Sequence, residues 1–582
     1  MSANADIARL FHEMADALEL LGENAFRVNA LRKVARVAED ATGDLVALAR
    51  ADTKAVEALE GIGASSARKI VEFAGTGAMH EHTELLAKLP PGLMQVLRVP
   101  GLGPKTVKLL WEQGGVSDLA TLKAKLASGE LAGLPRMGAK TLQNIAENLA
   151  FLETAGQRTR LGDALPVAEA LVAELSRLPG VKEAAFAGSL RRGRETIGDV
   201  DLLVATTKSG PIMDAFTSRP GVAKVLAHGE TKSSVRLTSG LQVDLRAVAP
   251  AAWGAALLYF TGSKEHNVLL RERAQRKGLR LNEYGLFKDD GKPEPPQERG
   301  LKPVAAATEA EVYKALDLPW VPPELREGRD ECEAAPPALI ELSDIQRELH
   351  CHTTASDGAC TIEAMATEAK RRGFDAIAIT DHSRSSAQAN GLSVERLREH
   401  IAAIRAAARR VSGIHILAGS EVDILADGRL DYPDDVLAEL DWVVASPHTA
   451  LKQEPAAATK RLLAAIEHPL VHVIGHPSGR MLGGRPGLEP DWAALFKAAA
   501  KSGVAMEINA NPHRLDLRDQ LVRSALTAGC HISINTDAHG LDNFDLLRCG
   551  VLTGRRGGLT AEGCVNAWPW RRFEAWRTSR GR

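Results

Sequence analysis

The second half of the sequence alternates short apolar runs with alanine-rich segments of helical length, and this alternation limits the fold more than any other feature. The pattern begins after Leu349 and continues to about Gly540. Neighbouring parallel strands need a long crossover between them, which is usually a helix. The alternation therefore predicts a parallel α/β domain with a barrel-like sheet. The predicted strands span residues 376–380, 415–419, 442–446, 471–475, 505–509 and 532–536.

Residue types that bind metal ions stand at the ends of these predicted strands. His350 and His352 are two positions apart, so both face the same side of one strand. The carboxyl ends of barrel strands converge on a single pocket. A set of this size exceeds the needs of one ion and predicts a cluster of two or three, of the kind that assists phosphoryl transfer. The candidates are His350, His352, Asp357, His382, Glu421, His448, His476, Asp537 and His539.

The remaining histidines of this half do not follow the predicted strand ends. Twelve of the 17 histidines fall at or after His350, so this half is histidine-rich as a whole. Several of them are better explained by packing or surface exposure than by metal binding. These excluded histidines are His415, His468, His472 and His531.

The ligand motifs together resemble the polymerase-and-histidinol-phosphatase (PHP) domain across residues 346 to about 545. The resemblance implies a distorted seven-stranded β/α barrel that holds two or three Mn²⁺ or Zn²⁺ ions and hydrolyses phosphoesters. It also implies Arg480 and Arg514 as phosphate contacts. Glu348 stands where relatives often have Asp, and we expect little effect from that difference. The resemblance leaves residues 545–582 without a role.

Composition excludes several classes of protein. The 582 residues predict about four domains, and 45% hydrophobic and 25% charged residues are ordinary for globular chains. No apolar run reaches membrane-spanning length, and residues 1–15 lack a basic-then-apolar leader pattern. All six cysteines lie at or beyond Cys332 without paired spacing. We therefore expect reduced thiols in a cytoplasmic, nucleoid-associated protein that has no membrane partner.

The net charge of −2 hides a basic region in the first half of the chain. Between Gly101 and Arg280 there are 25 Lys and Arg against 17 Asp and Glu. Aromatic residues make up only 4% of the chain, which argues against platforms that stack nucleic-acid bases. If a chain of this composition binds nucleic acid, it would therefore contact the phosphate backbone rather than the bases.

Three similar glycine turns occur in the first 150 residues, at 59–63, 99–103 and 134–138. Glycines let another backbone approach closely, and the amides at the start of the following helix point at an anion. A turn of this kind is either a simple helix cap or a helix-hairpin-helix contact to a DNA phosphate. Three copies favour the second reading, although the third has Arg136 in place of its first glycine. The candidate contacts are Gly61, Gly63, Gly101, Gly103 and Lys105.

Acidic residues on two predicted strands form a second metal-binding pattern. Asp199 and Asp201 are two positions apart, so both point to one face of a strand. Asp244 on a later strand supplies a third carboxylate. Such a set binds hard divalent cations, and two of these can activate a hydroxyl and stabilise a leaving pyrophosphate. Upstream, Gly188-Ser189 offers a close backbone approach and Arg192 a forked phosphate donor.

These acidic motifs and three further stretches resemble the family X DNA polymerases over residues 1 to about 320. The stretches are Gly229-Glu230-Thr231-Lys232, Tyr259-Phe260-Thr261-Gly262-Ser263 with Asn267 and Arg271, and Asn282-Glu283-Tyr284. The resemblance implies Mg²⁺ or Mn²⁺ at the three aspartates and a monovalent cation at the glycine turns. Its implied nucleotide and template contacts are Gly188, Ser189, Arg192, Gly193, Tyr259, Phe260, Gly262, Asn267 and Arg271.

Some relatives use a lysine of the N-terminal domain as a Schiff-base nucleophile, and the matching position here is Lys69. A lysine nucleophile needs a lowered pKa, from a nearby cation or from burial. The supporting positions depart from the family, with Leu31 in place of an aromatic residue and Ser65 and Glu81 in place of lysines. A solvated lysine that contacts phosphate is therefore the favoured interpretation.

The sequence as a whole predicts a multidomain α/β protein with six segments. They are a helical lyase-like domain (1–83), a helix-hairpin-helix domain (84–154), a nucleotidyltransferase palm with a mixed sheet (155–249), a nucleotide-selection subdomain (250–320), a linker (321–345) and the PHP barrel (346–582). The expected function is gap-filling DNA synthesis in repair, combined with 3′–5′ exonuclease, apurinic-site endonuclease or 3′-phosphatase activity. The expected partners are gapped or nicked DNA with 3′ ends and dNTPs, bound by a monomer.

Two alternatives remain open from the sequence. In the first, the chain is mainly a nuclease for DNA ends, and its polymerase module is weak or inactive. In the second, the PHP barrel is a non-catalytic brace for the polymerase. The intact aspartate set argues against the first alternative and the complete histidine set against the second.

Overall fold

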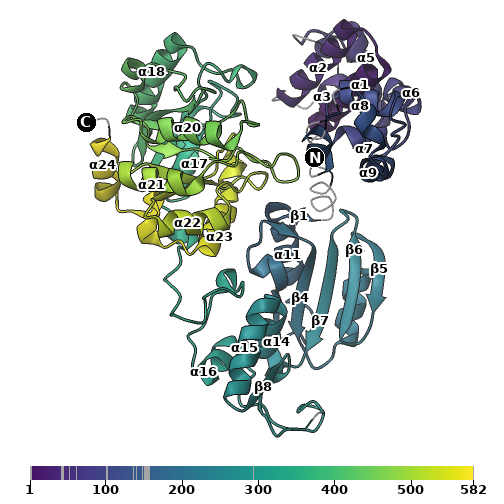
Figure 1. Cartoon of the computed structure of the whole chain (residues 1–582), viewed down its shortest axis with the longest axis vertical. Coiled ribbons are helices and arrows are strands. Elements are labelled where there is room, and N and C mark those ends of the chain that lie inside the picture. The colour runs from purple at the N-terminus through teal and green to yellow at the C-terminus, as the bar shows by residue number, and fades with distance from the viewer. Residues whose placement is uncertain are drawn as a thin grey trace. The chain divides into compact units, whose positions relative to one another are not determined.

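The computed structural model describes residues 3–40, 45–51, 53–59, 62–99, 102–135, 137–138, 140–146, 149, 158–292 and 294–580. The chain divides into two compact units, Met1–Gly156 and Gln157–Arg582, and Figure 1 colours it from purple at the N-terminus to yellow at the C-terminus. Among these described residues, no helix has both the length and the apolar character needed to cross a membrane.

The first unit consists of short helices around one apolar core. Ile7, Phe11, Met14 and Leu18 recur at helical spacing, and all four are fully buried on one face of the first helix. The helices are α1 (Ala3–Leu21), α2 (Ala25–Asp40), α3 (Leu45–Ala51), α4 (Thr53–Glu57), α5 (Ala64–Thr76), α6 (His80–Ala87), α7 (Leu93–Leu97), α8 (Pro104–Glu112), α9 (Leu119–Ser128) and the 3-10 turn η1 (Glu130–Gly133).

The second unit opens with a five-stranded mixed sheet, ordered β2-β4-β7-β6-β5. β4 (Asp199–Ala205) runs parallel to β7 (Gln242–Val248), and their register sets Asp201 beside Asp244. The helix α11 (Leu161–Leu175) packs its apolar face on this sheet. The other elements are β1 (Thr159–Arg160), β2 (Glu183–Phe186), α12 (Gly188–Arg191), β3 (Thr196–Ile197), α13 (Gly210–Ser218), β5 (Val222–His228) and β6 (Lys232–Leu237).

A smaller helical subdomain follows the sheet, and a buried ionic cluster ties the two together. Glu309 accepts hydrogen bonds from Arg191 of the sheet region and from Arg326, each at 2.7 Å. Burial opposes ionisation of Glu309, but the two arginines lower its pKa to about 2. The elements are η2 (Pro250–Ala252), α14 (Trp253–Thr261), α15 (Lys264–Arg276), β8 (Leu279–Asn282), β9 (Gly285–Lys288) and α16 (Glu309–Ala315).

The rest of the second unit is a parallel barrel of seven strands in sequential order, β10 to β16. The barrel is nearly closed, because Cys351 bridges Ala538 next to the last strand. The strands are β10 (Arg347–Cys351), β11 (Ala376–Ile379), β12 (His415–Asp423), β13 (Trp442–Ser446), β14 (Val473–Ile474), β15 (Ala505–Asn509) and β16 (Ile532–Asn535). The predicted strands are thus confirmed, and β12 extends four residues beyond its prediction to include Glu421 and Asp423.

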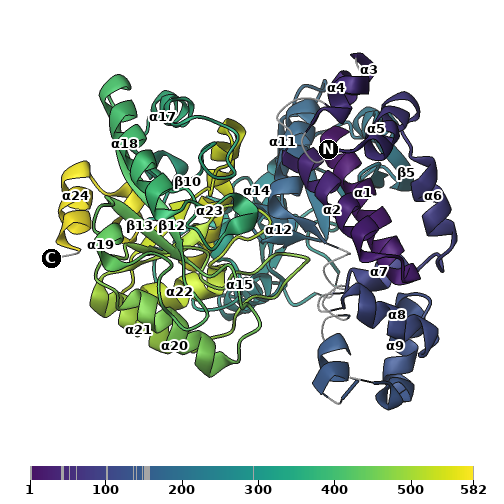
Figure 2. The ribbon, with the colours of Figure 1, turned by 90° about the horizontal axis from the view of Figure 1, so that it is seen from above.

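Helices surround the barrel strands, as Figure 2 shows for α18, α20 and α21. In α18, Ser393 caps the first turn, and buried Leu397, Ile401 and Ile404 form one apolar stripe. The outer elements are α17 (Ile362–Arg371), η5 (Ala387–Ala389), α18 (Val394–Arg410), α19 (Asp434–Leu437), α20 (Pro455–Ile466), α21 (Trp492–Ser502), α22 (Asp519–Thr527), η6 (Leu541–Leu546) and α23 (Leu547–Gly557).

The last residues, for which the sequence suggested no role, close one end of the barrel. α24 (Trp570–Ser579) follows the turns η7 (Ala561–Gly563) and η8 (Val565–Ala567). Its Phe573 is fully buried against Trp442, with ring centroids 5.6 Å apart. Trp442 and Val473 begin their strands, so this apolar plug fills the amino end of the barrel.

The barrel and the mixed sheet share a core. Leu515 and Cys549 of the barrel domain are buried in the same cluster as the residues of α11. The fit is close, since a Cβ added at Gly162 would lie 2.5 Å from atoms of Pro512. The connection between the two runs through η3 (Pro323–Leu325) and η4 (Leu342–Asp344), and its acidic residues pair with barrel arginines.

Candidate active sites

The aspartates of the mixed sheet lie together on β4 and β7. Asp199 is exposed, Asp201 half-buried and Asp244 buried. Burial raises the pKa of Asp201 to about 6, and the neighbouring charges of Asp199 and Asp244 add to this shift. Lys232 lies 2.7 Å from Asp244 and offsets part of the negative charge. Three crowded carboxylates with oxygen donors fit divalent cations of the Mg²⁺ class.

The turn before β4 brings its backbone against these carboxylates. Gly188 has a φ of +60°, a backbone conformation that residues with a side chain rarely adopt. A Cβ at this position would also lie 2.3 Å from Oδ2 of Asp201. Only glycine allows the turn to approach the aspartate this closely, which explains the Gly-Ser pair that the sequence contains.

Replacing Gly188 by Ala is therefore expected to displace Asp201 and slow nucleotide addition. A displacement of about 1 Å at a reacting centre can cost on the order of 100-fold in rate. Primer extension on gapped DNA measures the loss. Gly210→Ala is the matched control, because that glycine begins α13 and has open space at its Cβ position. Equal extension by the two variants would contradict this role.

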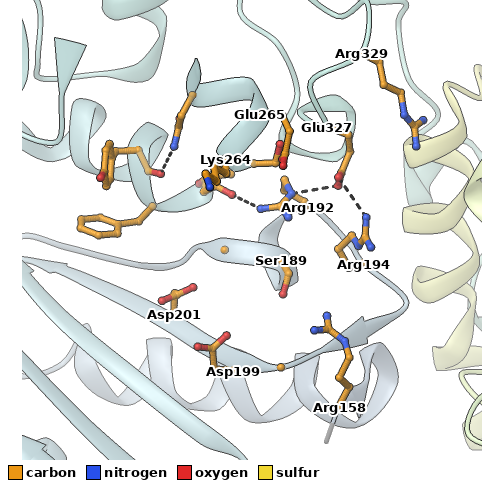
Figure 3. A pocket seen from close by; sticks show the side chains of 18 of the residues that line it. Arg158, Ser189, Arg192, Arg194, Asp199, Asp201, Lys264, Glu265, Glu327 and Arg329 are labelled. Atoms are coloured by element: carbon orange, nitrogen blue, oxygen red, sulfur yellow. Dashed lines mark hydrogen bonds and ion pairs between the residues drawn. The ribbon is translucent and has the colours of Figure 1, made fainter. Parts of the chain in front are cut away.

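A cleft of about 1020 Å³ opens beside the aspartates, and Figure 3 shows its lining side chains. Arg192 points into it and donates to the carbonyl of Thr261 at 2.5 Å. The predicted contacts Gly188, Ser189, Tyr259, Phe260, Gly262, Asn267 and Arg271 all line this cleft. Gly193 does not line it and lies instead under the barrel helix α23.

The aromatic pair of the cleft is fixed by its neighbours. The rings of Tyr259 and Phe260 meet edge to face at 5.1 Å, and Arg246 lies over Phe260 at 4.4 Å. Asn267 donates to the carbonyl of Tyr259 at 2.8 Å. Sequence reasoning missed the cations Arg158, Lys264 and Arg329, which also line the cleft but belong to none of the quoted motifs.

The nine predicted ligands of the barrel lie at the carboxyl ends of its strands. Eight of them form three overlapping groups, and within each group the donor atoms lie within 4.8 Å of one another. The ninth, His476, contacts Glu421 at 2.8 Å. The groups are His352, Asp357, His382 and His539; His350, His352 and Asp537; and His382, Glu421 and His448.

Unpaired buried atoms favour metal binding at this cluster. The Nε2 atoms of His350 and His352, Oε2 of Glu421 and Oδ1 of Asp537 are all buried without a hydrogen-bond partner. Buried polar atoms normally have a hydrogen-bond partner, so these atoms are candidate ligands for a cation. Burial opposes ionisation of Asp537, but the nearby charges of His350 and His539 hold its pKa well below its usual range. Imidazole and carboxylate donors in such groups suit divalent metal ions.

Several buried carboxylates orient the ligands, and the sequence analysis missed them. Glu507 accepts from Nδ1 of His350 at 2.8 Å and from the backbone amide of His476 at 2.7 Å. Asp423 pairs with Nδ1 of His448. Such partners fix the ring orientation of metal-binding histidines. A signal existed, because Glu507 stands on a predicted strand that faces the ligand pocket.

Glu348 links the first and last strands of the barrel. It is fully buried and accepts hydrogen bonds from the backbone amides of His350 and Thr536, each at 3.1 Å. Burial raises the pKa of Glu348 to about 7, although these hydrogen bonds oppose the rise.

Of the two predicted phosphate contacts in the barrel, one lies near the ligand cluster. Arg514 approaches Asp537 at 3.9 Å. Arg480 instead pairs with Glu195 of the mixed-sheet region at 2.7 Å and donates to the carbonyl of Leu515. It therefore contributes to the contact between barrel and sheet.

The glycine turns of the first unit share one geometry. In the described residues, Gly63 and Gly103 cap α5 and α8, and a Cβ at either would meet open space. The same backbone hydrogen bond recurs in each turn, from Ile62 to Leu59, Leu102 to Val99 and Met137 to Leu134. Lys105 is exposed beside the second turn. Gly61, Gly101 and Arg136 lie outside the described residues.

Lys69 is paired with the residues that depart from the family pattern. Its Nζ lies 2.9 Å from Glu81 and donates to the hydroxyl of Ser65 at 2.8 Å. Burial opposes ionisation of Glu81, but hydrogen bonds from Lys69 and Arg27 lower its pKa. The amine of Lys69 is thus held by two partners, whereas a Schiff-base nucleophile needs a free amine.

Comparisons with known proteins identify family models and relatives that this chain matches. Family models match for a helix-hairpin-helix domain (2–79), a SAM-like helix-hairpin-helix tandem (93–150), a DNA polymerase beta thumb (256–327) and a PHP domain (348–511). The chain is 37% identical over 566 residues to the DNA polymerase/3′-5′ exonuclease PolX of Bacillus subtilis, covering 97% of each. It is also 35% identical over 175 residues to a probable phosphatase of Caldicellulosiruptor bescii, covering 28% of this chain and 65% of that protein.

The first of these relatives matches over nearly its full length at well above 30% identity. This chain therefore belongs to the family X DNA polymerases that carry a C-terminal PHP domain.

Proposed function

We propose that this chain is a DNA-directed DNA polymerase that fills short gaps during repair and also removes nucleotides from 3′ ends in its barrel. The observation that carries the proposal is the presence of two separate candidate metal sites in one unit. One has three aspartates beside a cleft, and the other has nine candidate ligands, most of them buried, at the barrel mouth.

For synthesis, the residues around the cleft would have different roles. Asp199, Asp201 and Asp244 would hold Mg²⁺ or Mn²⁺, which supplies the charge that activates a 3′-hydroxyl and stabilises pyrophosphate. Ser189 and Arg192 would bind the triphosphate, and Gly193, whose amide donates to the carbonyl of Leu190, would shape the turn that carries them. The remaining contacts are Tyr259, Phe260 and Gly262 beside the sugar, and Asn267 and Arg271 near the base pair and template.

For hydrolysis, the barrel ligands would hold two or three Mn²⁺ or Zn²⁺ ions, which supply an activated water and polarise the phosphoester. Glu507 fixes the ring of His350 among the candidate ligands. Arg514 beside Asp537 would bind a phosphate oxygen of the substrate. Because α24 fills the amino end of the barrel, a 3′ end would have to enter from the carboxyl end, where the ligands lie.

For DNA binding, the glycine turns of the first unit would contact backbone phosphates, assisted by Lys105 and by a monovalent cation at the turns. These contacts carry no base information, as gap filling requires. Lys69 would contact phosphate rather than act as a nucleophile. We further propose that the protein works as a monomer on gapped or nicked DNA with dNTPs, and that the six predicted segments are its functional divisions.

One gapped duplex, labelled on the primer, tests both activities. With dNTPs and Mg²⁺ or Mn²⁺ the primer should lengthen to the gap end, and with Mn²⁺ or Zn²⁺ but without dNTPs it should shorten from its 3′ end. EDTA should abolish both. Shortening without any extension would support a nuclease with an inactive polymerase module. Extension without shortening, in a protein with metal bound at the barrel, would support the alternative in which the barrel is a non-catalytic brace for the polymerase.

A further inference from the structure

Glu327, in the connection that leads to the barrel, lies between arginines of the nucleotide cleft. Its carboxylate accepts from Nε of Arg192 and from Nη1 of Arg194, each at 3.2 Å. Figure 3 shows these contacts at the edge of the cleft, beside a barrel helix. The side chain of Glu327 is 12% exposed and that of Arg192 is 13% exposed. Little water therefore competes for this ion pair.

Arg556 of α23 holds the other side of Glu327. Its Nη1 donates to Glu327 at 2.8 Å and to the backbone carbonyl of Arg192 at 2.7 Å. Its Nη2 donates to Asp519 of α22 at 2.8 Å, so the guanidinium is fixed within the barrel. The side chain is only 3% exposed. A single barrel arginine thus contacts both the backbone of Arg192 and the carboxylate that binds its side chain.

The backbone beyond Arg192 also rests on the barrel. Gly193 has a φ of +66°, and a Cβ added there would lie 3.3 Å from Leu552 and 3.6 Å from Arg556. The turn between Ser189 and Arg194 is therefore enclosed by α23 on the side away from the aspartates. Its position depends on the barrel as well as on the mixed sheet.

These contacts leave Arg192 directed at the cleft. Its Nε–H is bonded to Glu327 and its Nη1 to the carbonyl of Thr261. Burial opposes ionisation of Glu327, but the charges of Arg556 and Arg192 lower its pKa, so the carboxylate is charged at neutral pH. A guanidinium has five N–H donors in a fixed plane, so fixing these two edges leaves the remaining donors for phosphate oxygens.

We propose that Glu327 and Arg556 are positioning residues for nucleotide addition, through which the barrel holds Arg192 in the orientation that binds an incoming triphosphate. The proposal rests on the proposed polymerase function. It gives the barrel a second role, independent of hydrolysis, as part of the wall of the nucleotide site. Fixing a side chain before binding improves affinity because less conformational entropy is lost on association.

Kinetics with the full-length protein tests this role. Glu327→Ala should raise KM for the dNTP about tenfold, the effect of one lost hydrogen bond between charged groups, with kcat changed much less. Arg556→Ala should do the same, and the double variant should not exceed the larger single effect, because both act through Arg192. Glu327→Gln should recover part of the affinity, since its amide oxygen can still accept from Arg192.

Arg523→Ala is the matched control. This barrel arginine also pairs with an acid of the connection, Asp330 at 2.5 Å, but it does not touch Arg192. It should leave KM for the dNTP unchanged. All variants should digest 3′ ends at the wild-type rate, which verifies that the barrel is folded.

Binding of a non-hydrolysable dNTP analogue, measured by calorimetry with Mg²⁺, separates this proposal from the polymerase assignment. Weaker analogue binding by Glu327→Ala and Arg556→Ala supports the positioning role, even for a protein that extends no primer. A lower KM in Glu327→Ala would overturn it, because the carboxylate would then compete with the triphosphate. Equal effects of Arg556→Ala and Arg523→Ala would also overturn it, and a wild-type protein that binds no analogue would overturn both proposals.

Discussion

Asp201→Asn is expected to lower primer extension on the order of 1000-fold or more, which corresponds to about 4 kcal/mol of lost transition-state stabilisation. The carboxylate lies between Asp199 and Asp244, the two other candidate metal ligands. Asparagine keeps the shape that fits against Gly188 but removes the charge that holds a divalent cation. Digestion of 3′ ends in the barrel should remain at the wild-type rate.

The stability of this variant provides a control. Burial and neighbouring carboxylates raise the pKa of Asp201 to about 6, above its usual value of 3.8. A carboxyl whose pKa rises on folding destabilises the folded state once the pH exceeds its unfolded pKa. Metal-free Asp201→Asn should therefore melt at or above the wild-type temperature at pH 8. Asp214→Asn, on the exposed face of α13, should change neither extension nor melting. Normal extension by Asp201→Asn would contradict the aspartate assignment.

Local patterns explain why the sequence could place the candidate metal ligands together. The two-residue spacing of Asp199 and Asp201, and of His350 and His352, puts each pair on one face of a strand whatever surrounds it. A parallel barrel then brings the strand ends together, so Glu421 and Asp537 could be placed without knowing any contact. These predictions needed only periodicity and the rule for parallel strands.

Contacts between distant segments could not be predicted in the same way. The sequence pattern indicates a basic first half and a histidine-rich second half, but the compact units divide at Gly156, so the mixed sheet belongs with the barrel. Leu515 and Cys549 look like ordinary apolar positions of the barrel, and nothing in their spacing indicates that they pack on α11. The ion pair of Arg556 with Glu327 joins positions 229 residues apart, and no motif contains both.

Buried carboxylates that orient the candidate ligands are a third group of features, and the sequence indicates them only weakly. Glu507 stands in an apolar strand and is easily read as a single unexplained carboxylate. Its place on a predicted strand is a signal of its own, but its role follows from the position of its oxygens, 2.8 Å from His350 and 2.7 Å from the amide of His476. The role of the residues after 545 could not be predicted either. The spacing of aromatic residues in a helix does not indicate which cavity the helix will fill. Its apolar plug around Phe573 became visible only once the barrel was assembled.

His352→Ala is expected to abolish 3′-end digestion, with a loss on the order of 1000-fold. His352 belongs to two of the three ligand groups, so its removal weakens two metal positions at once. Its ring is fully buried, and its Nε2 atom lies 2.9 Å from Oδ1 of Asp537, another candidate ligand. Primer extension in the presence of dNTPs should persist, because the mixed-sheet site has its own aspartates.

Metal analysis of the purified variant gives a readout that is independent of activity. Wild-type protein should carry two or three equivalents of Mn²⁺ or Zn²⁺, and His352→Ala should retain about one, because only the group of His382, Glu421 and His448 excludes His352. His468→Ala is the matched control, since that histidine pairs with Asp434 at 3.3 Å, outside the three groups. If His352→Ala kept the full metal content and digested 3′ ends normally, the barrel cluster would not be the hydrolytic site. Loss of metal with unchanged digestion would place the nuclease elsewhere in the chain and make the barrel a metal-stabilised support for the polymerase.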